Sequence, residues 1–399
     1  MEWKEVQLCD TCNLIAGYAF KSKDFGDYPS KVLKIADINP PFVSSENSSG
    51  VDLSKYDLSK LDKYIVKKGD YILAMTGATI GKLGRYISEE QAYLNQRVLK
   101  FNPHKSIDSD FLYYVLCGRV FPKYVMNHID SESAQPNISA GTIGKFVFQL
   151  PANIEDQRRI ASILSSLDDK IAVNRRICEN LEAQAQALFK NWFVDFAPFK
   201  DGKFVESELG MIPEGWRVGR LDNICCFSGS KIKISDLSLE TYYSTENMLP
   251  NKGGVTTAAS LPTIETTTAC FEYDVLISNI RPYFKKIFRA EKISGCSNDV
   301  MCFHPKDSKW NTLLYCILYD DKFFSYVMSG SKGTKMPRGD KKQIMKYTII
   351  VPTDDELRSF SQIVEPMFRL VQKAKQESSR LSTLRATLLP KLMSGEIKI

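Results

Sequence analysis

IASILSSLDDKIAVNRRICENLEAQAQALFKNW, from Ile160 to Trp192, is the stretch that decides how this chain is organised. Its apolar residues recur at alternating intervals of four and three. This heptad pattern, kept over more than four repeats, is typical of helices that pack against one another. A helix from Ile154 to Phe193 would be about 60 Å long, and the polar Asn174 is of the kind that fixes the register of a helix pair. The heptad positions are Ile160, Leu164, Leu167, Ile171, Asn174, Cys178, Leu181, Ala185, Leu188 and Trp192.

A second heptad pattern lies near the C-terminus, and Pro366 near its start predicts that the regular helix begins or kinks there. Two apolar seams in one chain most simply bury each other. The linker that follows the first helix, Ala197–Trp216, is short relative to that helix, which favours antiparallel pairing. The second seam comprises Val364, Met367, Val371, Ala374, Ser378, Leu381, Arg385, Leu388 and Leu392.

The sequence also repeats itself in order. GYAFKSKDF (17–25) returns as GSKIKISDL (229–237), VLKFNP (98–103) as VMCFHP (300–305), and IGKFVFQLP (143–151) as IMKYTIIVP (344–352). Each copy mixes short strands with a few helices and is followed by a long helix. The predicted fold is therefore α+β, with two similar mixed α/β domains separated by two long antiparallel coiled-coil helices. The predicted divisions are a first domain (1–151), a central helix (152–196), a linker (197–213), a second domain (214–352) and a C-terminal helix (353–399).

Composition narrows the class of protein. The chain has 399 residues, a net charge of +6 and ten cysteines. No apolar run is long enough to cross a bilayer, and the N-terminus lacks the pattern of a signal peptide. We therefore expect a cytoplasmic protein whose cysteines stay reduced. Basic residues crowd two stretches, 280–292 and 331–346, which favours an anionic partner, with an ordinary solvated surface as the alternative.

Two related but different domains joined by a rigid rod suit binding to an elongated partner such as DNA. At this point the residues resemble a family. The stretch LPANIEDQRRIASILSSLDDKIAVNRRICENLEAQAQALFKNWFVDF (150–196) and the PFKDGKFVESELGMIPEGWRVGRL that follows it (198–221) look like the central helix and linker of specificity (S) subunits of type I restriction–modification systems. GYAFKSKDF and LLPKLMSGEI (388–397) are similar to other landmarks of that family.

The resemblance implies two target-recognition domains, each reading half of a bipartite, asymmetric double-stranded DNA site, with the paired helices acting as a ruler. It implies that these helices dock two methyltransferase (M) subunits, and that restriction (R) subunits join through the M–S complex. S-adenosylmethionine, ATP and magnesium would then be bound by the partner subunits, with no cofactor or metal in this chain. The S subunit would do no chemistry itself.

Motifs that suggest an enzyme are incomplete in this chain. NPPF (39–42) matches the tetrad of adenine methyltransferases, but no Gly-x-Gly site for S-adenosylmethionine accompanies it, which favours a rigid turn after a strand. TGATIGKLGR (76–85) has the wrong glycine spacing for a P-loop, and its counterpart SNIRPYFKKIFR (278–289) has no glycine. With three histidines and no clustered carboxylates, no catalytic residue is predicted.

We interpret TGATIGKLGR as a strand end and loop that face DNA, with ordinary turn glycines as the alternative. The lysines near residues 21 and 231 are either DNA-facing or plain surface loops, and the amides of LNQR (94–97) and SND (297–299) either read adenine or cap turns. The candidate DNA-binding residues are Lys21, Ser22, Lys23, Thr76, Thr79, Lys82, Arg85, Asn95, Gln96, Arg97, Lys231, Lys233, Asn279, Arg281, Lys285, Lys286, Asn298, Lys332, Lys335 and Arg338.

Two other functions stay open on the sequence. One is a stand-alone adenine DNA methyltransferase or nuclease, which would act on DNA without partner subunits. The other is a coiled-coil adaptor that binds two copies of a protein and no nucleic acid. Salt-dependent DNA binding separates a DNA reader from the adaptor, because neutralised phosphates make affinity fall steeply with salt.

Overall fold

The computed structural model describes residues 2–130, 136–331, 333, 335–397 and 399. The chain forms two compact units. Unit 1 comprises Met1–Asn174 and Glu377–Ile399, and unit 2 comprises Arg175–Gln376. Each unit therefore combines one mixed α/β part with one half of each long helix.

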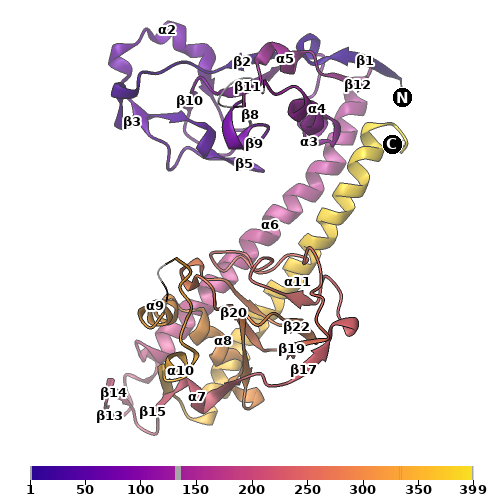
Figure 1. Cartoon of the computed structure of the whole chain (residues 1–399). Helices are drawn as coiled ribbons and strands as arrows, with labels where there is room; N and C mark the ends of the chain where they lie inside the picture. Colours follow the sequence, from indigo (N-terminus) through magenta and orange to yellow (C-terminus); the bar gives the residue numbers. More distant parts are fainter. Residues whose placement is uncertain (1, 131–135, 332, 334, 398) are drawn as a thin grey trace. The chain divides into compact units, whose positions relative to one another are not determined.

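Unit 1 is built on two sheets (Figure 1). The six-stranded sheet has the order β2 (Cys12–Ala16), β11 (Val98–Pro103), β8 (Tyr71–Ala74), β9 (Leu83–Tyr86), β5 (Phe42–Val43) and β4 (Ile38–Asn39). The four-stranded sheet has the order β6 (Gly50–Val51), β3 (Phe25–Leu33), β10 (Ala92–Leu94) and β7 (Ile65–Val66). Outside these sheets, β1 (Trp3–Gln7) pairs with β12 (Val147–Pro151). The helices are α1 (Leu8–Thr11), α2 (Leu58–Leu61), α3 (Ser109–Cys117), α4 (Val120–Asn127) and α5 (Ala140–Gly144).

Unit 2 contains two four-stranded sheets. One has the order β16 (Cys225–Phe227), β23 (Val300–Pro305), β20 (Val275–Ser278) and β21 (Ile287–Arg289). The other has the order β17 (Lys231–Lys233), β19 (Thr266–Cys270), β22 (Ser294–Cys296) and β18 (Tyr242–Tyr243). Two further pairs are β15 (Arg217–Arg220) with β24 (Thr348–Val351) and β13 (Phe204–Ser207) with β14 (Gly210–Pro213). The helices are α7 (Leu221–Ile224), α8 (Asn311–Tyr319), α9 (Asp321–Ser329) and α10 (Lys341–Ile344).

The strand pairing confirms the internal repeat. The order β2-β11-β8-β9 in unit 1 matches β16-β23-β20-β21 in unit 2, and β1–β12 matches β15–β24. In the second sheets, β3-β10-β7 matches β18-β22-β19, including the parallel pairs β3/β10 and β18/β22. The copies differ at their edges, because β4 and β5 extend the sheet of unit 1 only. They also differ at the GYAFKSKDF repeat, where β17 pairs with β19 in unit 2 but residues 19–21 form no strand in unit 1.

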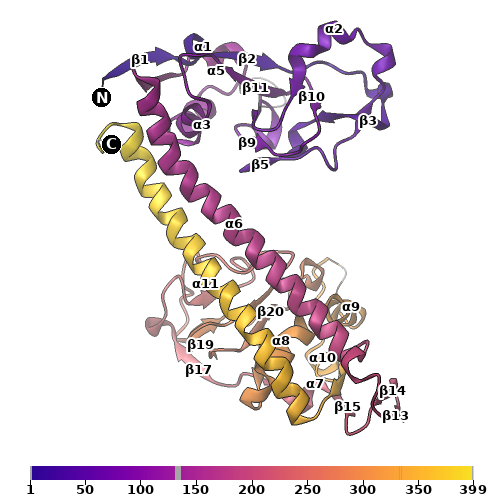
Figure 2. The same ribbon diagram turned by 180° about the vertical axis from the view of Figure 1, so that it is seen from behind.

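The two long helices are α6 (Ile154–Phe193) and α11 (Asp354–Met393), each about 60 Å long at 1.5 Å per residue. In unit 1, Arg385 on α11 pairs with Asp168 on α6 at 2.7 Å, and the Asn174 amide donates to Glu377 at 2.7 Å. In unit 2, the Cys178 thiol donates to the Val371 carbonyl at 3.6 Å, and the rings of Phe193 and Phe360 lie 4.8 Å apart. Within each unit, rising numbers on α6 meet falling numbers on α11. The predicted antiparallel pairing is thus confirmed, and it can be followed in Figure 2.

The heptad seams are also the buried faces of these helices. Leu164, Asn174 and Ala185 on α6 and Val364 and Leu392 on α11 are buried. The expectation that a regular helix begins near Pro366 is wrong, because α11 is helical from Asp354 onwards. Proline removes one backbone hydrogen bond within a helix, but burial of the preceding turns in the core of unit 2, through Leu357, Phe360 and Val364, holds this segment helical.

The segment after α6 is more ordered than a simple linker. It contains the β13–β14 hairpin, and the indole of Trp216 packs against the rings of Phe193 and Phe199 at 5.5 and 4.9 Å. These contacts fix the exit of α6 within unit 2. The division into domains at residues 151, 196, 213 and 352 stays a prediction.

Candidate nucleic-acid interface

The first candidate loop joins β8 to β9 in unit 1. It contains a 3₁₀ turn (Gly77–Thr79), and Gly77 and Gly81 have positive φ angles of 72° and 81°. The chain at Pro136–Ile138 runs beside it, with the Gly77 N–H donating to the Pro136 carbonyl at 3.0 Å. Thr76 is only 8% exposed, and its hydroxyl has no hydrogen-bond partner in the part of the chain that is described. The glycines therefore serve a tight turn at a strand end, not a phosphate cradle.

The matching loop of unit 2 joins β20 to β21 and has positive φ angles at the same two positions. Pairing of Tyr71 with Arg85 in unit 1 corresponds to pairing of Val275 with Arg289 in unit 2. This match places Arg281 at the position of Gly77 and Lys285 at that of Gly81, and both have positive φ angles, 51° and 50°. A side chain in this left-handed region costs about 1–3 kcal/mol. Unit 2 therefore keeps two basic residues where glycine would be less strained.

The amide-bearing stretches lie beside these loops, as the sequence repeat predicts. In unit 1 the Met75 N–H donates to the Arg97 carbonyl at 3.0 Å, and in unit 2 the Asn279 N–H donates to the Asp299 carbonyl at 2.8 Å. Gln96, Arg97 and Asn298 are exposed, while Asn95 accepts a hydrogen bond from the Gln96 N–H at 2.7 Å. Each unit thus gathers a loop and an amide stretch at the end of one strand.

In each unit a third segment lies beside the loop and the amide stretch. The sequence predicted this segment in unit 2 only. Arg338 bridges Ile280, and its guanidinium lies 3.2 Å from the Asp299 carboxylate. In unit 1 the equivalent residue is Asn137, which is exposed and bridges Thr76. The signal for Asn137 was available, because Pro136 and Pro337 each stand three residues before a helix N-cap, Ser139 and Asp340.

Lys21, Ser22 and Lys23 are exposed and lie on a turn held from within. The Tyr56 hydroxyl donates to Asp24 at 2.7 Å and accepts from the Lys21 N–H at 3.1 Å. Lys55 pairs with Asp24 at 3.2 Å. The Tyr56 hydrogen bond and Lys55 together lower the pKa of Asp24. Tyr56 lies 35 residues from Lys21 in the sequence, so no pattern of neighbouring residues could have predicted this support.

Substituting Asp24 by Asn is expected to lower the melting temperature at neutral pH. An aspartate whose pKa is lowered on folding adds stability above its unfolded pKa of about 3.9, and that stability is lost as the pH falls through the folded value. The difference in melting temperature between wild type and Asp24→Asn should therefore shrink as the pH is lowered below about 4. Asp27→Asn, an exposed neighbour, is the control. Equal pH profiles for both variants would contradict the assignment.

The remaining candidates are more scattered. Lys231 and Lys233 lie on the edge strand β17 and pair with Thr268 and Thr266 of β19 in the same sheet. Lys285 pairs with Asp321 at 3.0 Å, and the Lys286 ammonium donates to the Thr245 carbonyl at 2.5 Å. Both lysines therefore already have partners within unit 2. Thr79 is partly buried, Lys82 and Lys335 are exposed, and Lys332 lies outside the described residues.

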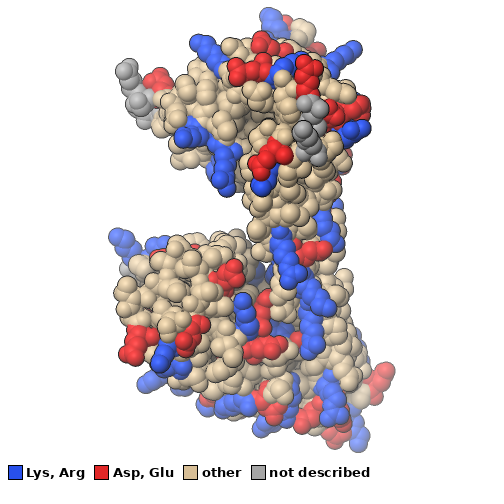
Figure 3. Space-filling model, turned by 90° about the vertical axis from the view of Figure 1, so that its right-hand side faces the viewer, with Lys and Arg blue, Asp and Glu red and all other residues tan. Residues whose placement is uncertain are grey.

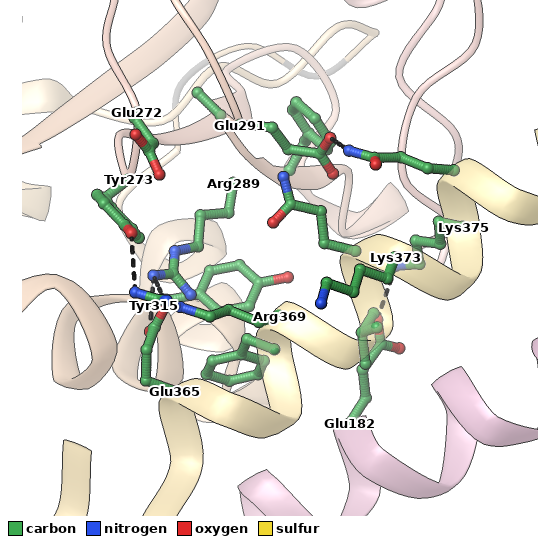
Figure 4. Close-up of a pocket in the computed structure, with 16 residues that line it drawn as sticks. Glu182, Glu272, Tyr273, Arg289, Glu291, Tyr315, Glu365, Arg369, Lys373 and Lys375 are labelled. Atoms are coloured by element: carbon green, nitrogen blue, oxygen red, sulfur yellow. Dashed lines mark hydrogen bonds and ion pairs between the residues drawn. The ribbon is translucent and has the colours of Figure 1, made fainter. Parts of the chain in front are cut away.

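Arg85 was predicted to face DNA as part of the β8–β9 loop, but in the structure it lies away from that loop. It pairs with Tyr71 at the other end of the β8–β9 hairpin, and its guanidinium lies 4.0 Å from Asp110 of α3. Its counterpart in unit 2, Arg289, lines a hollow of about 510 Å³ beside α11 (Figure 4). There one nitrogen of Arg289 lies 2.8 and 3.0 Å from the two carboxylate oxygens of Glu365. This position holds a strand against neighbouring helices, so its geometry favours packing over DNA contact.

On the face that Figure 3 shows, Lys and Arg are interspersed with Asp and Glu and form no single large patch among the described residues. DNA contact would therefore depend on the few convergent groups at the strand ends more than on a broad positive field.

Features that could belong to an enzyme have structural roles here. Asn39 and Phe42 of NPPF pair across the turn between β4 and β5. His304 lies 2.6 Å from Asp274, a buried carboxylate that also caps the turn before β20 by accepting from the Phe271 N–H. All ten cysteines are free thiols, and burial raises the pKa of Cys12 to about 12.

Among the described residues, no cluster of His, Cys, Asp or Glu could hold a metal, and no helix is long and apolar enough to span a bilayer.

Comparison with known proteins shows what the chain is similar to. A family model described as the type I restriction modification DNA specificity domain matches residues 1–183. The type I restriction enzyme MjaIX specificity subunit of Methanocaldococcus jannaschii is 26% identical, over 95% of this chain and 96% of that protein. The HindI specificity subunit of Haemophilus influenzae is 24% identical, over 99% and 100%. Residues 1–183 thus match the DNA specificity domain of type I restriction modification systems, and nearly the whole chain is similar to type I restriction enzyme specificity subunits.

The fold agrees with that of a solved specificity subunit. A crystal structure of the S subunit from M. genitalium matches with a TM-score of 0.63 at 17% identity, covering 98% of this chain and 96% of that one. The likeness extends over both units and both long helices. The paired strand-end groups described above occupy matching places in this repeated fold and carry different side chains, with Gly77 and Gly81 in unit 1 and Arg281 and Lys285 in unit 2.

Proposed function

We propose that this chain is the DNA sequence-specificity subunit of a type I restriction–modification complex and that it reads a bipartite, asymmetric site. The observation that carries the proposal is the pair of equivalent strand-end loops with different side chains. Gly77 and Gly81 in unit 1 correspond to Arg281 and Lys285 in unit 2, and all four residues have positive φ angles. Two copies of one scaffold with different polar groups would read two different short sequences.

The long helices would set the gap between the half-sites and dock the methyltransferase subunits. Both helices run unbroken through residues of both units, so a change in their length would be transmitted to both. Several large apolar side chains on them stay exposed, which suits burial by a partner. These side chains are Val173 and Ile177 on α6 and Ile363, Leu370 and Leu384 on α11.

The chemistry would lie in the partners. Two methyltransferase subunits would bring S-adenosylmethionine, and restriction subunits joining through the M–S complex would bring ATP and magnesium. This chain would supply recognition only, in the cytoplasm, where the DNA and these partners would be found. The turn geometry of NPPF, with Asn39 and Phe42 paired across it, supports this assignment over a stand-alone methyltransferase.

A selection from randomised duplex DNA by the full-length chain, alone and with its methyltransferase subunits, tests the proposal. Two short, different motifs separated by unspecified base pairs are expected, with an affinity that falls steeply as salt rises. Retention of no DNA in either form would favour a coiled-coil adaptor. Methyl transfer to DNA by the purified chain alone would instead favour an enzyme.

A further inference from the structure

Three positive-φ residues of unit 2 stand where unit 1 has glycines. Tyr273, Arg281 and Lys285, with φ angles of 75°, 51° and 50°, correspond to Gly69, Gly77 and Gly81. For two of these residues, side-chain contacts within unit 2 explain why a side chain stands at a position that favours glycine. The Tyr273 ring lies 4.6 Å from the Arg289 guanidinium, and Lys285 pairs with Asp321. Arg281 differs, because no ion pair holds it among the described residues and its Nε is buried without a hydrogen-bond partner.

The surroundings of Arg281 are polar and converge on the end of β20. Its backbone N–H donates to the Pro337 carbonyl at 2.8 Å, which fixes the residue against the Arg338 segment. Asn279, two residues earlier, is 9% exposed, and its side-chain oxygen also lacks a partner. Buried polar groups normally find partners within the fold. Arg281, by contrast with Asn279, is only half-buried, so its guanidinium is the group at this strand end that a ligand can reach.

We infer that Arg281 reads a guanine of the second half-site through its guanidinium. The inference rests on the proposed function and adds the base and the residue that reads it. A guanidinium can donate two parallel hydrogen bonds to O6 and N7 of guanine in the major groove, which no other base pair offers. Glycine would relieve the backbone strain at this position, so an arginine retained there is explained by what its side chain binds. Unit 1, with Gly77, would read its half-site without this contact.

The test compares Arg281→Gly with wild type in selection from randomised duplexes by the full chain with its methyltransferase subunits. Wild type should select a guanine in one half-site. The variant should lose that preference by about 10- to 100-fold while the other half-site stays unchanged. Its melting temperature should be equal to or above that of wild type, because glycine tolerates the backbone. Arg281→Lys should keep overall affinity but lose most of the guanine preference.

The matched control is Asn251→Gly, an exposed positive-φ residue whose N–H donates to the Phe284 carbonyl of the same loop. It should leave both half-sites as in wild type. A second half-site without guanine, or an unchanged preference in Arg281→Gly, would overturn the inference while leaving the split site intact. A melting temperature lowered by several degrees in Arg281→Gly would also overturn it, since it would show a structural role. Failure of wild type to select any split site would instead reject the proposed function, and the inference with it.

Discussion

Deleting one heptad from each long helix is expected to change the gap between the two half-sites by about three base pairs and to leave both half-sites unchanged. Seven helical residues span about 10.5 Å, and base pairs are about 3.4 Å apart. The deletion removes Asp169–Arg175 from α6 and Glu377–Thr383 from α11. Asn174 and Glu377, which bond to each other, leave together. The Asp168–Arg385 pair of unit 1 and the Cys178–Val371 contact of unit 2 remain.

Selection from randomised duplexes measures this gap directly. A variant in which the same residues are replaced by a heptad-matched sequence of equal length is the control, and its gap should equal that of wild type. Deleting the heptad from α6 alone should abolish split-site binding, because it shifts the two seams out of register. An unchanged gap after the double deletion would show that the helices do not set the spacing.

Removing the Glu365 carboxylate should cause the largest loss of stability. Glu365→Ala leaves the Arg289 guanidinium, whose side chain is 11% exposed, without its counter-ion. Breaking a buried ion pair at one partner costs roughly 3–5 kcal/mol, and here the Thr312 hydroxyl also loses its acceptor at 3.0 Å. The free energy of unfolding of unit 2 should fall by about 3 kcal/mol, measured by urea denaturation.

Two further variants distinguish the stability contributed by the buried Arg289–Glu365 pair from that of exposed charges nearby. Arg369→Ala removes an exposed arginine that also pairs with Glu365, at 3.5 Å, and should cost less than about 1 kcal/mol. The double variant Arg289→Ala/Glu365→Ala should be less destabilised than the sum of the two single variants, because no charge is then left buried and unpaired. Equal, small losses for Glu365→Ala and Arg369→Ala would show that the Arg289 pair is not a buried clamp.

The long helices and the repeat could be predicted from the sequence for a local physical reason. Heptad spacing from Ile160 to Trp192 is a property of neighbouring residues, and it forces burial along one face of the helix. The matching strands were predictable because VLKFNP and VMCFHP carry the same alternation at the same place in each copy. The prediction that the regular helix begins at Pro366 was wrong, because burial of Phe360 and Val364 outweighed the lost hydrogen bond; a kink at Pro366 stays a prediction.

The parts of the candidate site that were missed depend on contacts between distant residues or on backbone angles. Tyr56 supports the Lys21 turn from 35 residues away, and the separation of Arg85 from its loop follows from strand register. The left-handed conformation of Arg281 is set by the loop as a whole and has no marker in the residue itself. Base contacts cannot be read from sequence for the same reason, since they require groups brought together by the fold.

A genome-wide map of methylated adenines, in cells with and without this chain, tests the central claim most directly. The account predicts methylation confined to one asymmetric motif of two short sequences with a fixed gap, and its disappearance when the chain is absent. A continuous or palindromic motif, or an unchanged map without the chain, would contradict it.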